Sequence, residues 1–170
     1  MALRYVDPSR PANMANRALM RFGRSRAGQL FARHVAARTD IWLGRVSSGR
    51  VNWGMFNVPS ATLHTIGARS GEPRQVQIAY FHDNEDVVAI ASNFGGANHP
   101  GWYYNLVAHH ACTLGGEQFE AREVTDKAEC SRLYDVAERY YGGFADYRMR
   151  TELLGRTIPI MRLSPPVAGG

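Results

Sequence analysis

The strongest constraint on the fold is a hydrophobic pattern with a period of two that begins near residue 60. Successive side chains of a β-strand point to opposite faces, so this alternation predicts strands. Short turns rich in glycine, asparagine or acidic residues separate the runs, which predicts antiparallel neighbours. Pro159 interrupts the last run, which favours a sheet edge or a bulge for that strand. The expected strands are residues 61–66, 76–80, 86–92, 112–114, 118–124 and 157–163.

Helical signals flank these strands. The first 45 residues read as helical, because apolar residues recur at three- and four-residue spacing. A second helix is expected to begin at Pro100, with Asn98 or His99 as its cap. A third is expected after Thr125 as its cap. Its expected apolar face consists of Leu133, Val136, Ala137 and Tyr140.

Antiparallel strands closed by short turns, with helices at intervals, predict an α+β chain built on a small barrel with added helices. The length of 170 residues is enough for one domain with a substantial core. We expect a basic helical segment over residues 1–50 and a barrel domain over residues 51–170.

Positive charge is concentrated at the start of the chain. The first fifty residues hold ten arginines and two aspartates, whereas the remainder has thirteen acidic and ten basic residues. Such a distribution favours an anionic partner surface. An apolar stripe through Leu30, Phe31 and Val35 is compatible with peripheral contact to an anionic membrane, and equally with packing on the barrel. Nucleic acid is not expected as a partner, because the strand-rich part is net negative.

Several classes of protein are disfavoured. The chain has no run of about 18 apolar residues, which a membrane-spanning helix needs, and its start lacks a secretory signal. Its cysteines are Cys112 and Cys130, without metal-ligand spacing, so neither a disulfide framework nor a metal site is expected. A cytoplasmic location follows as the expectation. Nucleophile-elbow, Walker A, Rossmann and zinc-protease motifs are absent from the sequence.

The turn between the first two expected strands carries more than a turn requires. It reads Gly67-Ala68-Arg69-Ser70-Gly71-Glu72-Pro73 and is followed by Arg74. Backbone amides in a glycine-containing turn can form an anion-binding nest. Ser70 adds a hydroxyl, and the two arginines add planar donors suited to phosphate or carboxylate. The alternative is an ordinary hairpin with solvated arginines.

A second segment, residues 91–106, runs from a strand end into a helix start. Gly95 and Gly96 allow close approach of a backbone, and the helix start offers electropositive amides. Trp102 and Tyr103 add aromatic faces, although Trp102 can equally serve as a core anchor. Both glycine-containing segments thus offer groups that can bind an anion, and the second adds aromatic faces. We infer one planar ligand that bears phosphate and contacts both segments.

A third segment, residues 140–147, contains three tyrosines and a phenylalanine around Gly142 and Gly143. Tyrosine combines an apolar face with a polar tip, which suits an aromatic substrate. We expect a flexible aromatic pocket wall here. Ordinary aromatic packing at a helix end is the alternative.

Together these segments resemble the deazaflavin-dependent nitroreductases of actinobacteria, which use coenzyme F420 on an antiparallel, FMN-binding-like split β-barrel. The resemblance runs from about Ile41 to Pro165. This chain has Ala68 where the family usually has a second basic residue, and Phe94 lengthens the following loop. The motifs that carry the resemblance are Gly67-Ala68-Arg69-Ser70-Gly71 with Pro73-Arg74, Ala91-Ser92-Asn93, Pro100 to Leu106, and Arg156-Thr157-Ile158-Pro159-Ile160.

The resemblance implies a coenzyme site and a hydride transfer to an enone, quinone or nitroaromatic. Tyr147, Ser92 or water would supply the proton, with Tyr141 and Phe144 beside the acceptor. Phe144 stands where a tyrosine occurs in the best-known nitroreductase. The implied coenzyme-binding residues are Ala68, Arg69, Ser70, Arg74, Gln75, Val76, Gln77, Ile78, Ala79, Ile90, Ala91, Ser92, Asn93, Gly101, Trp102, Tyr103, Tyr104, Asn105 and Phe144.

Two other functions remain open at this point. The same barrel could carry a non-catalytic binder of a cofactor or lipid, such as a haem or fatty-acid carrier. The arginine-rich start could alternatively make the chain an adaptor for a membrane surface or nucleic acid. A monomer or weak dimer is expected.

Overall fold

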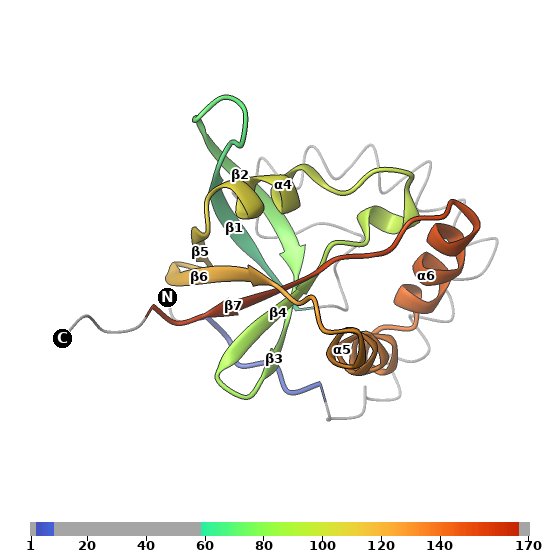
Figure 1. The fold of residues 1–170 in the computed structure, drawn as a ribbon. Helices are drawn as coiled ribbons and strands as arrows, with labels where there is room; N and C mark the ends of the chain where they lie inside the picture. Colours follow the sequence, from blue (N-terminus) through green and yellow to red (C-terminus); the bar gives the residue numbers. More distant parts are fainter. Residues whose placement is uncertain (1–2, 9–58, 167–170) are drawn as a thin grey trace, which may run out of the picture.

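The computed structural model describes residues 3–8 and 59–166 (Figure 1). The helices expected within the first 45 residues, and the membrane contact expected of that segment, lie outside the described residues. Among the residues described, no helix has the length and apolar character needed to cross a bilayer.

Seven strands form one curled antiparallel sheet in the order β2-β1-β5-β6-β7-β4-β3. β1 and β2 form a long hairpin at one end of the sheet, and the last strand in sequence, β7, lies between β6 and β4. The strands are β1 Ser60–Ile66, β2 Pro73–Ala79, β3 Phe81–Asp83, β4 Asp86–Ile90, β5 Ala111–Leu114, β6 Glu117–Glu123 and β7 Ile160–Ser164.

In the part of the chain that the structure describes, three α-helices and a short 3-10 turn accompany the sheet. α4 lies beside the β1–β2 hairpin, whereas α5 and α6 lie together at the end of the sheet that holds β3 and β4 (Figure 1). The chain leaves β4 through the 3-10 turn and passes over the molecule to α4. The elements are η3 Asn93–Gly95, α4 Gly101–Ala108, α5 Lys127–Tyr140 and α6 Gly143–Leu153.

The core fills the concave side of the sheet with residues from nearly every described element. Leu63, Leu114 and Leu163 are fully buried on their strands, and Leu106 and Leu133 reach them from α4 and α5. Burial of one such side chain contributes about 1.5–3 kcal/mol. The expected α+β antiparallel split barrel is therefore confirmed for the described part of the chain.

Three local expectations were wrong. β7 pairs with both β6 and β4, so it is an interior strand, and Pro159 precedes it and leaves its ladder intact. Asp126 caps α5 in place of Thr125, since its Oδ1 accepts a hydrogen bond from the amide of Glu129 at 2.8 Å. Pro100 occupies the cap position of α4 without a side-chain hydrogen bond.

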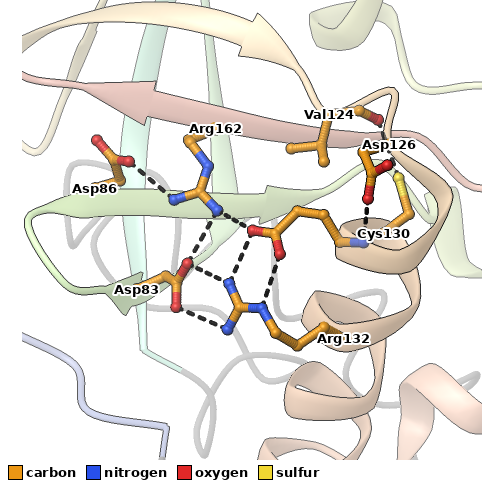
Figure 2. Close-up of polar contacts among 8 residues, drawn as sticks. Asp83, Asp86, Val124, Asp126, Cys130, Arg132 and Arg162 are labelled. Atoms are coloured by element: carbon orange, nitrogen blue, oxygen red, sulfur yellow. Dashed lines mark hydrogen bonds and ion pairs between the residues drawn. The ribbon is translucent and has the colours of Figure 1, made fainter.

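An ion-pair cluster joins the β3–β4 turn, β7 and α5 (Figure 2). Arg132 binds both carboxylate oxygens of Asp83, at 2.6 and 3.1 Å, and Arg162 bonds Asp83 at 2.9 Å and Asp86 at 2.8 Å. Glu129 accepts from both arginines. These hydrogen bonds, first that of Arg132, hold the pKa of Asp83 below its ordinary value.

Candidate functional site

The turn between β1 and β2 is closed by its own hydrogen bonds. The amide of Gly67 donates to Glu72 O at 2.8 Å, and the amide of Gly71, which has φ +67°, donates to Gly67 O at 2.9 Å. Ser70 Oγ accepts from Arg74 Nη2 at 3.2 Å and lies where a Cβ on Gly67 would approach to 2.6 Å. The turn therefore holds Ser70 and Arg74 together, and it leaves Arg69 and Arg74 exposed.

Asn105 of α4 ties the helix to this turn. Its Oδ1 accepts a hydrogen bond from the amide of Ala68 at 3.0 Å, and its Nδ2 donates to Thr65 Oγ1 at 3.0 Å. The same side chain thus fixes the end of β1 and the first residue of the charged turn relative to α4. Two segments of the predicted coenzyme site, the charged turn and α4, are joined by this one amide.

On the inner face of the sheet, the side chain at the middle of β2 is exposed, whereas the residues beside it on β1 and β5 are buried. Val76 is opposite Leu63, which is opposite Leu114 on the other side. Both leucines are 0% exposed, but Val76 is 37% exposed. Residues two apart share a face, so Arg74 and the buried Ile78 flank Val76. A surface that passes from apolar to basic along β2 suits a flat ring with an anionic tail.

Gln75 and Gln77 belong to the opposite face of β2 by the same alternation. Gln75 is opposite His64, which is opposite Thr113 on β5. A groove of about 530 Å³ on that face includes Gln75 and also Arg74. The side chains of the predicted run from Arg74 to Ala79 therefore cannot all meet one ligand on the inner face.

The start of α4 is open towards solvent. A Cβ built on Gly101 would meet nothing within 4 Å, and the first turn contains neither a side-chain cap nor an acidic residue. Trp102 packs partly against the core, which agrees with its reading as an anchor. Tyr103 donates to Glu123 Oε2 at 2.9 Å, and burial and this bond raise the pKa of Tyr103 to about 12. The amides at the start of α4 are thus presented on a firmly held helix.

The segment after β4, residues 91–99, has an unusual backbone. Asn93, Phe94 and Gly95 have φ of 49°, 54° and 75°, all in the left-handed region. A left-handed conformation costs roughly 1–2 kcal/mol for an ordinary L-residue. Phe94 is nevertheless 76% exposed, so burial of its side chain does not compensate. Backbone strain of this kind persists only where the surroundings enforce it.

Arg156 holds this strained backbone in place through hydrogen bonds. Its guanidinium donates to the carbonyl oxygens of Ala91 at 2.7 Å, Ser92 at 3.1 Å and Gly96 at 2.5 Å, and to His99 Nδ1 at 3.0 Å. Hydrogen bonds from a charged donor contribute about 1.5–3 kcal/mol each, which exceeds the backbone strain. In the sequence, Arg156 is only the first residue of a motif that carries the resemblance, and its contacts could not be predicted because backbone carbonyls have no signature in sequence.

An aromatic cluster lies against the other side of this segment. Phe94 meets Tyr147 edge-on with ring centroids 6.1 Å apart, and Tyr147 also contacts the rings of Tyr141 and Phe144. A Cβ on Gly95 would lie 3.3 Å from Tyr147 Cα, so η3 is seated directly on α6. Burial, together with the neighbouring Tyr141 hydroxyl and a hydrogen bond to it, raises the pKa of Tyr147. The Tyr147 hydroxyl stays protonated and can donate.

The segment expected to be a flexible wall is regular structure. Gly142 is the N-cap of α6, and the helix runs from Gly143. A Cβ on Gly143 would overlap the Tyr141 ring, so the glycine permits close packing. Phe144 is buried in the core, and its carbonyl accepts from the Tyr134 hydroxyl at 3.0 Å. Phe144 therefore packs against the aromatic cluster from the side of the core.

The predicted site residues thus form two groups. The first joins the β1–β2 turn, the inner face of β2 and α4 through Asn105. The second joins the 91–99 segment to Tyr141 and Tyr147. His99 connects them, since its ring lies 5.0 Å from that of Tyr103 and 5.9 Å from that of Tyr104. The side chains of Ile90 and Ala91 are buried, and Ala91 joins the second group through its carbonyl.

Within residues 3–8 and 59–166, no group of three His, Cys, Asp or Glu side chains is placed so that it could hold a metal ion. The chemistry available there is anion binding at the turn and helix start, stacking on aromatic and apolar faces, and proton donation from tyrosine.

Comparisons with known proteins address the same part of the chain. Residues 36–165 match the family model described as F420H(2)-dependent quinone reductase. An F420H(2)-dependent quinone reductase of Mycobacterium tuberculosis strain H37Rv is 31% identical over 142 residues, which span 78% of this chain and 93% of that protein.

Solved structures show the same similarity. An F420-H2 dependent reductase, FDR-A, superposes with a TM-score of 0.53 at 28% identity and covers 62% of this chain and 94% of its own. A structure described as a domain-swapped dimer has a TM-score of 0.55 at 24% identity, with 75% and 98% covered. The latter likeness shows the fold alone.

Proposed function

The chain belongs to the F420H(2)-dependent quinone reductase family, and from that premise we propose that it reduces small quinones, with enones and nitroaromatics as poorer acceptors. Membership confirms the resemblance to coenzyme F420-dependent split-barrel reductases, the class of oxidoreductase and the coenzyme. The identity of the acceptor and the roles of individual residues remain proposals.

The described residues fit this coenzyme on three observations. Ser70 and Arg74 are held together on a turn with an exposed second arginine. The inner face of β2 has an open apolar position at Val76 beside that turn. Open space adjoins Gly101 at an uncapped helix start. The open, basic-to-apolar face of β2 is the observation that carries the proposal, because it offers one surface to a ring and its anionic tail.

In this arrangement, Arg69, Ser70 and Arg74 bind the phosphate and acidic tail through charge-assisted hydrogen bonds. Val76 and Ile78 form the wall along β2 next to Ala68 of the turn, and Gln75, Gln77 and Ala79 contribute through their backbone. The amides from Gly101 to Asn105 add an electropositive helix start. Ile90 to Asn93 pass along the ring with their backbone, and Phe144 supports them from the core side.

When bound, the reduced coenzyme supplies the hydride, and the protein contributes orientation and proton supply. Reduction of a quinone to a hydroquinone consumes one hydride and one proton. Tyr147 donates that proton from its hydroxyl, and Tyr141, which is hydrogen-bonded to it, returns a proton from solvent. Ser92 is the alternative donor at the same segment.

Acceptor preference tests the proposal directly. Purified protein is mixed anaerobically with reduced coenzyme F420 and, in separate reactions, with a naphthoquinone, a cyclic enone and a nitroaromatic at equal concentration. We expect the highest kcat/KM with the naphthoquinone. Reduced FMN and NADPH serve as control donors and should give no turnover. Faster reduction of the enone or nitroaromatic would overturn the quinone assignment, and turnover with NADPH would overturn the dependence on this coenzyme.

A further inference from the structure

Arg156 differs in what it binds from Arg132 and Arg162, the two arginines of the ion-pair cluster. Arg132 and Arg162 are held by carboxylates in the ion-pair cluster. Arg156 donates to three backbone carbonyls and one imidazole. Within residues 3–8 and 59–166, no carboxylate forms an ion pair with it. These contacts do not neutralise the positive charge of the guanidinium, because their acceptors are uncharged. We infer that they serve to fix the shape of the backbone.

The acceptors of Arg156 bracket the strained residues. Ala91 and Ser92 precede the left-handed triplet that begins at Asn93, and Gly96 and His99 follow it. A planar guanidinium can bridge several carbonyls at fixed angles, whereas a lysine ammonium acts as a point charge. The arginine thus clamps both ends of a backbone segment that would otherwise relax.

His99 extends the clamp to α4. Its Nδ1 accepts from Arg156 Nε, so in this contact the ring carries no proton at Nδ1. The ring also packs against Tyr103 and Tyr104 in the first turn of α4. Arg156 and His99 therefore join the segment that seats Phe94 on Tyr147 to the helix start proposed to bind the coenzyme.

We propose that Arg156 is a positioning residue for hydride transfer, which acts by holding residues 93–95 in their left-handed conformation and by coupling the 91–99 segment through His99 to α4. This inference rests on the proposed function, because the segment is the one assigned to the coenzyme ring. A displacement of about 1 Å at a reacting centre can cost roughly 100-fold in rate. Loss of the clamp should consequently appear in kcat more than in coenzyme affinity.

The test compares Arg156→Lys and Arg156→Gln with Arg132→Gln, a matched loss of a guanidinium from the ion-pair cluster. Wild-type turnover is measured first, so that failure of the proposed function is recognised separately. Dissociation constants for oxidised coenzyme F420 come from fluorescence quenching, and kcat and KM come from naphthoquinone reduction. We expect both Arg156 variants to lose about 100-fold in kcat with less than a tenfold change in coenzyme affinity. Arg132→Gln should keep wild-type kcat.

Hydrogen exchange of the coenzyme-free protein gives a readout that does not depend on activity. The amides of Gly95 and Gly96 donate to Ser92 O at 3.0 Å and Asn93 O at 2.9 Å. In Arg156→Lys, peptides covering residues 91–99 should exchange faster, while peptides of the β1–β2 hairpin should not change. Full kcat in Arg156→Lys would overturn the clamp, because charge alone would then suffice. Unchanged exchange would overturn it as well.

If Arg156→Gln does not fold, His99→Ala tests the coupling, because it removes the imidazole acceptor and its ring contacts with α4 and leaves the three carbonyl acceptors in place. We expect a loss of about five- to tenfold in kcat with unchanged coenzyme affinity, and partial recovery in His99→Asn, which retains a short side chain with an acceptor. Wild-type kcat in His99→Ala would limit the clamp to the three carbonyls and overturn its coupling to α4.

Discussion

The side chain of Asn105 accepts a hydrogen bond from the backbone amide of Ala68, a residue 37 positions earlier in the chain. Together with its bond to Thr65, this contact positions the charged turn against α4. The proposed anion-binding parts of the site therefore come from two segments that one carboxamide joins.

Replacement of Asn105 by alanine should weaken coenzyme F420 binding by up to about 30-fold, because net contributions near 1 kcal/mol are lost at each of two hydrogen bonds. Fluorescence titration measures this. Thr65→Val is the matched control, since it removes only the bond to Asn105 Nδ2 and should have a smaller effect. Equal affinity in wild type and Asn105→Ala would show that the turn is positioned without the helix.

Arg74→Ala should weaken coenzyme binding by roughly 10- to 150-fold, since a charge-assisted hydrogen bond contributes about 1.5–3 kcal/mol. The loss should shrink at high salt, because Arg74 is exposed and its attraction to an anion is screened. Arg139→Ala, an exposed arginine on α5, is the control and should bind normally. If Arg69→Ala and Arg74→Ala both bind like wild type, the arginines of this turn are merely solvated.

Gly101→Ala separates stability from binding. A Cβ at this position meets no protein atom within 4 Å, and alanine favours helix over glycine, so the melting temperature should stay the same or rise. The added methyl group would occupy the space assigned to the coenzyme, and affinity should fall at least about tenfold. Val107→Ala, on the exposed side of α4, provides the control. Tight binding by Gly101→Ala would place the coenzyme elsewhere.

Tyr147→Phe should lower turnover with naphthoquinone by about 10²–10⁴-fold, the usual loss for one positioned proton donor. The ring and its contacts with Phe94 and Phe144 remain, so coenzyme affinity should change little. Because the folded protein raises the pKa of Tyr147, wild-type kcat should not fall from its ionisation between about pH 7 and pH 9. Full turnover would assign the proton to Ser92 or water, and lost coenzyme affinity would move Tyr147 to the coenzyme site.

Asp83→Asn should reduce stability near neutral pH by about 1–3 kcal/mol, through loss of charge-assisted bonds to Arg132 and Arg162. The folded-state pKa of Asp83 is depressed, so its contribution is present above the unfolded value near 3.8 and disappears as the pH falls through the folded value. Denaturation of both proteins from pH 7 down to about pH 2 measures this. The curves should converge at the acid end, whereas Glu85→Gln in the same turn should follow wild type throughout.

Local sequence patterns predicted much of the barrel. The alternation in residues 61–66 and 76–80 specified the β1–β2 hairpin, since a period of two requires one buried and one solvated face. The pattern was less informative for α6, whose first residues combine Gly142, Gly143 and several aromatics that read equally as a loop. The interior place of β7 depends on pairing with β4, more than sixty residues earlier, which no local pattern encodes.

The candidate site likewise contains residues that the sequence could identify and residues that it could not. Arg69, Ser70 and Arg74 could be singled out because charge, hydroxyl and glycine coincide in a short turn. Arg156 was singled out only as part of a motif that carries the resemblance, and its role could not be predicted, because its partners are 57 to 65 positions away and three of them are backbone oxygens. The sequence around Phe144 predicted that its side chain lies beside the ligand. In the structure this side chain is buried and packs against Tyr134 of α5, a contact between two helices that the local sequence does not reveal.

The position of Arg156 and β7 near the end of the chain has a consequence during protein synthesis. A nascent chain that has emerged only through β6 already contains the charged turn, α4 and the 91–99 segment. It lacks the guanidinium that holds that segment and the strand that closes the sheet between β6 and β4. On the ribosome, Arg156 therefore cannot hold the backbone of residues 91–99 until the last part of the domain has emerged, and a chain that terminates before Arg156 lacks these hydrogen bonds.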